Sequence, residues 1–575
     1  MRTAILMAFL IGFSWVSPGN GSAVVDRYLE RYFQTFPSAA TAAGRHDLDG
    51  QLEDLGPSQR QNWIRFNRET ADILKAQLAD SALAFEDRLD LELLLREAER
   101  QIFTFGIEDS PAHDPLFWTG MLGNATVFLL VRDDLPSAER LASAAARASR
   151  IPRLADQARE ALGRTAPSRI AAELCAMAEN QARSTATFYR EGFPQAAVDA
   201  DPELRQKVEE SGVAAAAALT ELADFLSRLQ QSATGSVRLG DLYPTKFRLV
   251  TGVQEPVEKV LSAALEALAL KVGETAAYGR SQWSAIFPAE IPPTGDREVI
   301  EALFARVSED RAASTEEFVA DYQSLVDRSV QFVRDRRMMT LPEPLTLQLG
   351  RSPSFFIGQS VGGVYPAGPY APDDAKTLLF LPTPSDQATP EQRDAFFRDF
   401  NHHFNVMITP HELIPGHYLQ LKWAARHPRK VRALFGDGVY IEGWGTFAER
   451  LMLDLGWGEP LDRVAHLKKQ LENIARTIVD IRVHTRDMSR DKVLAFVQEE
   501  ALQDEQFAAN MWRRTITSAP QLTFYYLGYR EVWSLYEDVR EARGKDFDLQ
   551  AFMDGMMELG PVPVREYRQR MLGID

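Results

Sequence analysis

The hydrophobic pattern of the chain is helical over most of its length. After residue 24, Val25, Tyr28, Leu29, Tyr32 and Phe33 recur three or four positions apart, as one buried face of a helix requires. Stretches rich in Ala, Leu and Glu, with few internal helix breakers, repeat this pattern further along the chain. They predict long helices at 140–162, 204–229, 256–278, 297–333, 392–408, 442–455, 461–485 and 519–542. The fold class that we predict is therefore mainly α.

Two short apolar runs, 345–349 and 377–381, interrupt the helical pattern and flank a glycine-rich segment at 358–368. Short runs of this kind are typical of strands and predict a small sheet. We expect strand 377–381 to lie at an edge of this sheet, where an extended peptide could pair with it. The proline-rich segment 341–344 is the better of two candidate boundaries. It divides the chain into an N-terminal helical region, 24–340, and a C-terminal region, 341–575.

The first 23 residues have the organisation of a secretory signal peptide. Arg2 precedes an apolar run from Ala4 to Val16, and Gly21 and Ala23 supply the small side chains that signal peptidase requires. The apolar run is too short to span a bilayer comfortably, and no later run is long enough. We expect residues 1–23 to be removed and the mature protein to be exported, either periplasmic or secreted, without an integral membrane segment.

Charge and composition narrow the function classes. The chain has 64 Lys and Arg residues against 81 Asp and Glu residues, and its formal net charge of -17 argues against binding to nucleic acid. With 575 residues, the chain exceeds the size at which a single core usually stops growing, so two subdomains are expected. Cys175 is the single cysteine, which excludes an intramolecular disulfide.

A candidate metal site begins with the segment His411-Glu412-Leu-Ile-Pro415-Gly416-His417. In the common zinc-peptidase motif, two histidines four residues apart bind the metal and the glutamate after the first activates water. Here the second histidine comes two residues late, and a separation of six residues places side chains about 120° apart on an ideal helix. Pro415 has no amide hydrogen for the His411 carbonyl. We expect Pro415 and Gly416 to bulge the helix and to return His417 to the ligand face.

Two carboxylates downstream complete the candidate site. Glu442 and Glu449 are seven residues apart, two helical turns on one face. Zinc peptidases of this kind take a third ligand from a glutamate on a second helix, and another carboxylate often orients a ligating histidine. We assign His411, His417 and Glu442 as ligands of one Zn²⁺ per chain and Glu449 as the supporting carboxylate, with the reverse assignment of the two glutamates left open.

These residues resemble those of the bacterial family catalogued as domain of unknown function 885, in which a His-Glu-Ala-x-Pro-Gly-His pattern precedes Glu-Gly-Trp. The resemblance covers nearly the whole mature chain. Near the start it includes Phe36-Pro37, Ala40-Thr41, Gly44, His46, Asp49 and Asp54, and near the end Pro520-Gln521, Tyr525 and Gly528. The chain departs from the family pattern at Leu413 and Tyr418, where the family usually has Ala and His.

The family in turn resembles the thimet-oligopeptidase and carboxypeptidase Taq class of helical zinc peptidases. This resemblance implies a large helical architecture with a deep cleft and a small sheet near the active-site helix. It also implies that a tyrosine donates a hydrogen bond to the developing oxyanion. Tyr525 is our first choice for this role and Tyr529 the second.

Three further residues are expected at a substrate site. Arg514 lies where the family usually has an arginine, and its guanidinium suits a substrate carboxylate, although the adjacent Arg513 could serve instead. Asp480 and His484 have helical i, i+4 spacing and match a family Asp-x-x-x-His pattern. They are expected to line the cleft or to form a structural ion pair.

Together these observations predict an exported zinc metallopeptidase that hydrolyses short peptides. Glu412 is the expected general base that takes a proton from metal-activated water. Two alternatives remain open: hydrolysis of another amide or ester at the same site, and a catalytically silent relative that binds peptides or a partner.

Overall fold

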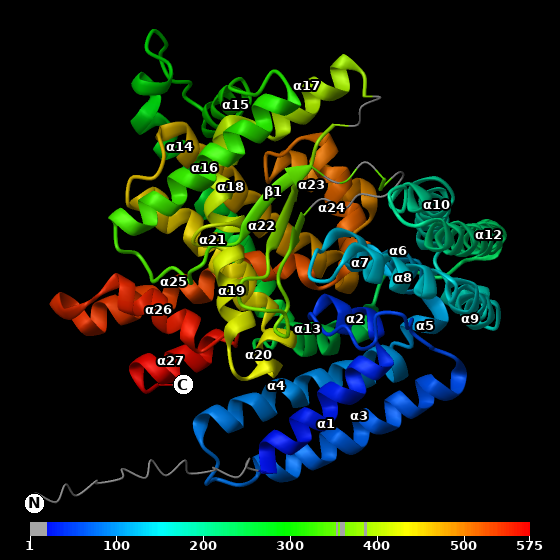
Figure 1. Cartoon of the computed structure of the whole chain (residues 1–575). Helices are drawn as coiled ribbons and strands as arrows, with labels where there is room; N and C mark the ends of the chain where they lie inside the picture. The colour runs from blue at the N-terminus through cyan, green and yellow to red at the C-terminus, as the bar shows by residue number, and fades with distance from the viewer. Residues whose placement is uncertain (1–19, 352, 354, 357–362, 385–387, 575) are drawn as a thin grey trace, which may run out of the picture.

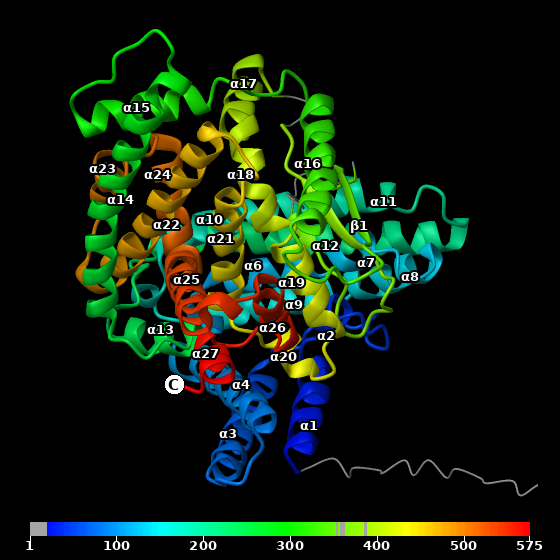
Figure 2. The same cartoon turned by 90° about the vertical axis from the view of Figure 1, so that its left-hand side faces the viewer.

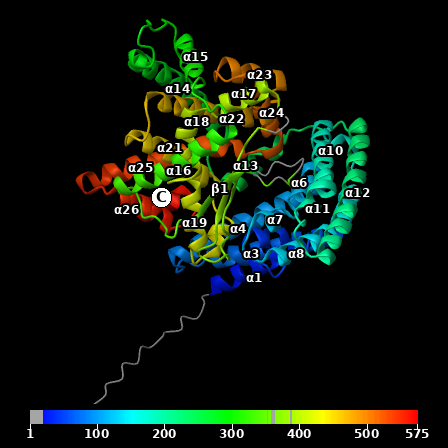
Figure 3. The same ribbon diagram turned by 45° about the horizontal axis from the view of Figure 1, so that its top comes forward.

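The computed structural model describes residues 20–351, 353, 355–356, 363–384 and 388–574, and it is mainly helical with one small sheet, as the sequence predicts (Figure 1). Most of the predicted signal peptide, residues 1–19, lies outside the described residues. Helices α10 (Ala172–Thr187) and α12 (Pro202–Ser232) form one flank of the molecule, and α25 (Phe524–Arg543) and α26 (Leu549–Glu558) form the other (Figures 1 and 3). Strand β1 (Leu347–Arg351) lies between the two flanks. Within the described ranges, we find no helix with the length and apolar character needed to cross a membrane.

The remaining α-helices lie before and after the three strands in the sequence. Before the sheet they are α1 (Asn20–Thr35), α2 (Pro37–Ala42), α3 (Pro57–Leu78), α4 (Phe85–Ile102), α5 (Ser110–His113), α6 (Pro115–Asn124), α7 (Val127–Val131), α8 (Ser137–Ala148), α9 (Ile151–Gly163), α11 (Phe193–Gln195), α13 (Tyr243–Thr251), α14 (Val257–Ile286), α15 (Asp296–Val307) and α16 (Thr315–Asp335). After the sheet they are α17 (Pro390–Asp399), α18 (His402–Glu412), α19 (His417–Arg426), α20 (Lys430–Leu434), α21 (Gly438–Asp454), α22 (Pro460–Arg486), α23 (Arg490–Glu499), α24 (Glu505–Ser518) and α27 (Val564–Leu572).

Three predicted helices are each divided in two, at points where polar caps or a proline start a new helix. The stretch 140–162 forms α8 and α9, and a proline occupies the first turn of α9. Within 297–333, the Ser314 side chain accepts the Glu317 amide and begins α16. Within 392–408, the Asn401 side chain accepts the Phe404 amide and begins α18. Hydrophobic periodicity continues across these breaks because both halves face the same core.

The sheet contains β1, β2 (Gly363–Tyr365) and β3 (Thr377–Leu381), in the order β1-β3-β2. Strand β3 pairs parallel with β1 and antiparallel with β2. The expectation that 377–381 is an edge strand is therefore wrong: β2, from the end of the glycine-rich segment, covers its second side. The first positions of this segment, 358–362, lie outside the described residues.

The sheet separates two cores. Leu378 on β3 belongs to the core of the N-terminal helices, whereas Leu379 and Leu381 point to the opposite side and belong to a second core. This second core joins side chains from before residue 340, such as Val333 and Met338, to α18, α21 and α25. A third core joins α14 to α22 and α24. The buried packing therefore continues across residue 340, where we expected the boundary between regions.

The residues near the N-terminus that resemble the pattern of domain of unknown function 885 make specific contacts in the structure. Thr41 donates to Asp49 at 2.6 Å and accepts from the fully buried Arg147 at 2.7 Å. Nδ1 of His46 lies 2.9 Å from the other oxygen of Asp49. Gly44 has φ +84°, and a Cβ there would lie 2.6 Å from the Ala371 amide nitrogen. Gly44 therefore packs the end of α2 against the segment that leads into β3, and Thr41 joins α2 to Arg147 of α8.

Candidate metal centre

The two motif histidines lie on either side of a helix break. Helix α18 ends at Glu412 and α19 begins at His417, so the expected bulge within one continuous helix is wrong. Pro415, which follows a cis peptide bond, cannot donate to the His411 carbonyl, and the helix stops instead of bulging. A Cβ at Gly416 would lie 1.9 Å from the His411 carbonyl oxygen, so only glycine fits this turn. Trp444 Nε1 donates to the Pro415 carbonyl at 2.9 Å and fixes the turn against α21.

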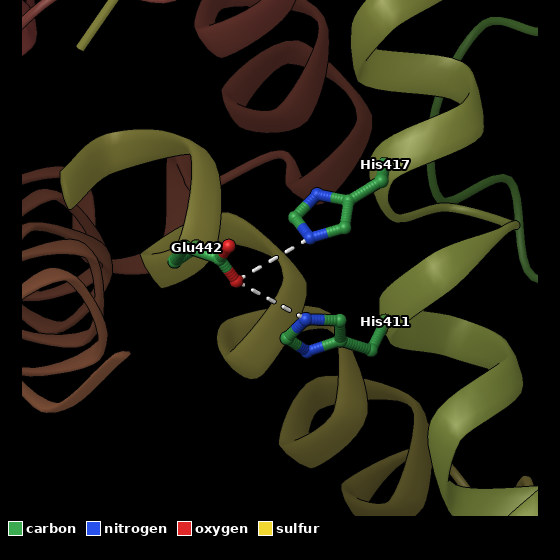
Figure 4. A group of neighbouring side chains, drawn as sticks. All are labelled: His411, His417 and Glu442. Carbon is green, nitrogen blue, oxygen red and sulfur yellow. Dashed lines mark ion pairs between the residues drawn. The ribbon is translucent and has the colours of Figure 1, made fainter. Parts of the chain in front are cut away.

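The turn brings His417 to His411 and to Glu442 of α21 (Figure 4). Oε2 of Glu442 lies 3.5 Å from Nε2 of His411 and 3.5 Å from Nε2 of His417. The three ligand atoms lie within 4.8 Å of one another. Zinc bonds of about 2.0–2.2 Å at tetrahedral angles place neighbouring ligand atoms roughly 3.3–3.5 Å apart, close to the two distances observed. The side chains are 3%, 12% and 18% exposed for His411, His417 and Glu442, so the group opens to solvent on the side of His417 and Glu442.

Glu449 lies behind this group and not within it. Its Oε1 is 2.7 Å from Nδ1 of His411, and its Oε2 is 2.9 Å from Nδ1 of His466 on α22. The side chain of Glu449 is fully buried. A carboxylate in this position holds the His411 proton on Nδ1 and leaves Nε2 free to bind a metal. The geometry therefore favours Glu442 as ligand and Glu449 as support over the reverse assignment.

The charges of the site favour a cation between the carboxylates. Burial works against a charged imidazole, but hydrogen bonds to Glu442 and Glu449 raise the pKa of His411 to about 10. Burial also works against ionised carboxylates, but hydrogen bonds from His411 and His466 lower the pKa of Glu449 to about 2. The pKa of Glu442 is lowered in the same way by His411 and His417. In the metal-free chain a proton supplies the positive charge that these buried carboxylates require.

Two glycine contacts bring α21 into this position. A Cβ at Gly445 would lie 2.9 Å from the His411 ring, so the imidazole rests directly on the α21 backbone. Where α21 crosses α25, a Cβ at Gly443 would lie 2.3 Å from the carbonyl carbon of Gly528, and a Cβ at Gly528 would lie 1.9 Å from the Val439 carbonyl oxygen. The close crossing allows α25 to present Tyr525 beside Glu442.

Changing Gly528 to Ala is expected to lower the free energy of unfolding by about 1–3 kcal/mol, because the new methyl group forces α25 away from α21. Gly273→Ala on α14 is the matched control, since a Cβ at this exposed helical glycine meets no atom within 4 Å. The control should raise stability by up to about 1 kcal/mol through helix propensity. Urea denaturation measures the free energy of unfolding of both variants. Equal effects of the two substitutions would contradict the tight crossing of α21 and α25.

Glu412, the last residue of α18, is half-buried beside the ligands. Within the part of the chain that the structure describes, no protein group bonds to its carboxylate. Its charge acts on Tyr322 of α16, whose pKa is raised first by burial and then by Glu412. The charge of Glu412 also acts on His411, so the carboxylate lies near the metal group.

The two candidate tyrosines face different surroundings. Tyr525 lies beside the metal group: burial and then the charge of Glu442 raise its pKa, and Arg514 donates to its hydroxyl at 3.2 Å. The Tyr529 hydroxyl instead accepts from Arg450 at 2.6 Å, and burial raises its pKa to about 12. The geometry favours Tyr525 over Tyr529 as the group that faces the metal centre.

Asp480 and His484 do not form the expected pair. Tyr243 donates to Asp480 at 2.5 Å. His484 accepts the Leu239 amide at Nδ1 (3.2 Å), and its Nε2 lies 3.1 Å from the Thr515 carbonyl oxygen. Both ring nitrogens of this buried histidine have backbone partners, so the structure gives His484 a packing role between α22 and α24.

A family model described as "Bacterial protein of unknown function (DUF885)" matches residues 37–571. The chain belongs to the DUF885 family. No curated protein matches it.

Two solved structures share the fold of this DUF885 chain. A candidate lipoprotein of unknown function from Shewanella oneidensis is 26% identical, with a TM-score of 0.78, and the match covers 96% of this chain and 99% of that one. A candidate lipoprotein from Colwellia psychrerythraea is 15% identical, also with a TM-score of 0.78, and the match covers 96% of this chain and 98% of that one. The second likeness, at this identity, concerns the fold alone.

Sequence reasoning on this DUF885 chain missed two residues near the metal centre. His466 completes the contacts of Glu449, and Arg476 stacks on the Tyr525 ring with its guanidinium carbon 4.9 Å from the ring centre. Both lie within the predicted helix 461–485, and their contacts are with α21 and α25. Because these contacts join different helices, no spacing along the chain could have indicated them.

Proposed function

We propose that this DUF885 protein is an exported zinc metallopeptidase that hydrolyses peptide bonds of short peptides. The observation that carries the proposal is the group of His411, His417 and Glu442, whose ligand atoms lie within 4.8 Å of one another. The adjacent Glu412 carboxylate has no hydrogen-bond partner among the described residues, and its charge acts on His411. Two imidazoles, one carboxylate and a neighbouring free carboxylate are the set that a zinc hydrolase uses.

The donors fit zinc in type and in arrangement. Two nitrogen ligands and one oxygen ligand, with the side facing solvent left open, are typical of a catalytic zinc site. Glu449 fixes the tautomer of His411, as expected for a carboxylate behind a ligating histidine. When bound, zinc supplies Lewis acidity and lowers the pKa of a coordinated water to about 7.

The residues of the chain then perform the proton transfers. Glu412 takes a proton from the attacking water and delivers it to the departing amine, as a general base and then a general acid. Tyr525 donates its hydroxyl hydrogen to the oxygen of the scissile carbonyl as negative charge develops there. Arg514, which donates to Tyr525, orients that phenol and is placed to meet a carboxylate on the substrate.

Export is part of the proposal. The N-terminal segment has the pattern of a signal peptide, and the 26% identical structural relative from Shewanella oneidensis is a candidate lipoprotein, a class of exported protein.

Metal analysis together with a digest tests the proposed function. Purified mature protein should contain about one zinc per chain by elemental mass spectrometry and should cleave components of a mixed short-peptide digest. Removal of the zinc with a chelator should abolish cleavage, and added zinc should restore it. Absence of metal under zinc-replete conditions would contradict the site. Stoichiometric zinc without cleavage of any peptide would favour the binding role or another amide or ester.

A further inference from the structure

A second group of charged side chains lies beside Tyr525. Helix α22 contributes Lys469 and Arg476, and α24 contributes Arg514; we refer to these three as the cationic cluster. Helix α22 packs against both α24 and α25 (Figure 2). Arg476 and Arg514 both contact Tyr525 of α25, and Lys469 is linked to Arg476 through Glu472. The cluster is not needed to hold the metal.

The cluster carries more positive than negative charge. Lys469 Nζ lies 3.2 Å from Oε2 of Glu472, and Arg476 Nη2 lies 3.8 Å from the same oxygen. Arg514 has no carboxylate within 4.0 Å in the described part of the chain. Three cations therefore share one carboxylate as their direct partner.

Burial of this excess positive charge destabilises the folded protein. The side chains of Lys469 and Arg476 are 13% and 8% exposed. Burial, and then the charge of Arg476, lower the pKa of Lys469, and burial lowers the pKa of Arg476 with a further contribution from Arg514. Such uncompensated charge is destabilising unless an anion joins it.

The head of Arg476 is fixed in place but keeps free donors. It donates to Asn473 Oδ1 at 2.8 Å and stacks between Phe507 and Tyr525, with its guanidinium carbon 5.5 Å and 4.9 Å from the two ring centres. Nη2 of Arg476 lies 3.8 Å from Glu472 Oε2, beyond hydrogen-bonding distance, so within the described residues the guanidinium makes one hydrogen bond, to Asn473. A held guanidinium with free N–H groups is the geometry that recognises a carboxylate.

The cluster adjoins the metal centre through Tyr525. Arg514 donates to the Tyr525 hydroxyl at 3.2 Å, and Arg476 covers the ring. The charge of Glu442, the proposed metal ligand, acts on both Tyr525 and Arg476. An anion bound by the two arginines would therefore lie beside the bond to be cleaved.

We infer that the cationic cluster is a carboxylate-binding subsite in which Arg476 and Arg514 hold a carboxylate of the peptide substrate next to the metal centre. The inference rests on the proposed function, because it defines the substrate class of the same site. The carboxylate belongs either to the C-terminus of a short peptide or to an acidic side chain, and both present the same chemistry to the arginines.

Isothermal calorimetry of peptide binding to the zinc-loaded Glu412→Gln protein tests the subsite. The substitution prevents cleavage of the probes during the measurement. The probes are acetyl-Ala-Ala-Ala with a free C-terminus, the same peptide as its C-terminal amide, and acetyl-Ala-Ala-Asp amide. Binding of the first probe alone identifies the C-terminal carboxylate as the ligand, and binding of the first and third identifies any carboxylate at this position. Equal affinity for all three, or no binding of any, would overturn the inference.

Two variants in the same background locate the carboxylate. Arg476→Gln and Arg514→Gln should each weaken binding of the carboxylate probe about 10- to 100-fold, the effect of losing one charge-assisted contact, and should leave binding of the amide unchanged. Arg513→Gln is the matched control, because the exposed Arg513 side chain donates to Asn510 at 2.7 Å, whereas Arg514 is the one that contacts Tyr525; the structure therefore favours Arg514 over Arg513 at this site. Circular dichroism confirms folding of each variant, and Arg514→Gln provides the test if Arg476→Gln fails to fold. Unchanged affinity in the folded arginine variants would overturn the inference.

The subsite and the peptidase can fail separately. Carboxylate binding that depends on Arg476 or Arg514, together with no cleavage by the wild-type protein, would retain the subsite and remove the peptidase. The opposite result is that the wild-type protein cleaves free and amidated peptides equally and that neither arginine substitution changes the rate. This result would retain the peptidase and remove the subsite.

Discussion

Replacing Glu412 with Gln is expected to lower peptide cleavage by about 10²–10⁴-fold while the zinc content stays near one per chain. An amide has the shape of the carboxylate but cannot take a proton from water. Because no protein group in the described residues bonds to the Glu412 carboxylate, the change removes no observed contact. The loss should therefore appear in kcat, with little change in folding or in metal affinity.

Steady-state cleavage of one short peptide, elemental mass spectrometry and thermal unfolding on the same sample measure these three properties. Glu290→Gln is a suitable control, because Glu290 is exposed and distant in sequence from the metal motif. If Glu412→Gln cleaved as fast as the wild type, Glu412 could not be the general base. If the chain were instead a catalytically silent binder, the variant would lose little of any measured property.

The sequence was sufficient to predict which three side chains the fold brings together, because each of them belongs to a short motif. His411 and His417 lie within seven residues, and Glu442 opens the Glu-Gly-Trp-Gly segment. How the chain brings them together was less predictable. The Pro-Gly pair predicted a helix bulge, whereas the helix ends at Glu412 and a new one begins at His417. The absence of an amide at Pro415 is compatible with either geometry, and the contact from Trp444 that fixes the observed turn comes from another helix.

In the fold, too, features set by neighbouring residues were predictable, whereas features set by residues distant in the sequence were not. Helical periodicity predicted most of the helices, since it depends on neighbours three and four residues away. The position of β3 in the middle of the sheet depends on pairing with β2, a strand of three residues in a glycine-rich segment. Such a short strand has too few residues to show alternation. His466 and Arg476 were missed for a related reason, because their partners lie on other helices.

The Glu442-Gly443-Trp444-Gly445 segment shows why the motif residues occur together. Glu442 contributes the carboxylate, Gly443 permits the close crossing with α25, Trp444 holds the Pro415 turn, and Gly445 leaves room for the His411 ring. Each residue positions one part of the centre. A change at any of the three residues after Glu442 should therefore act on metal affinity through geometry, although none of them can bind metal.

Replacing His411 or His417 with Ala is expected to lower zinc affinity by about 10²–10³-fold. Structural zinc sites with four ligands bind with about 10–16 kcal/mol, so one ligand contributes roughly 3–4 kcal/mol. Glu449→Gln should have a smaller effect, about 10–100-fold, because the amide keeps the volume but loses the charge that supports His411. Competition with a chromophoric chelator measures all three affinities at one pH.

The order of these effects distinguishes a ligand from its support. His466→Gln should weaken zinc binding less than Glu449→Gln, because His466 reaches the metal centre only through Glu449. His427→Ala, a histidine outside the centre, should leave zinc affinity unchanged. If Glu449→Gln cost as much affinity as His411→Ala while Glu442→Gln cost little, the roles of the two glutamates would have to be exchanged. A loss confined to His411, with none at His417, would instead mean that the histidine after the Pro-Gly turn is not a ligand.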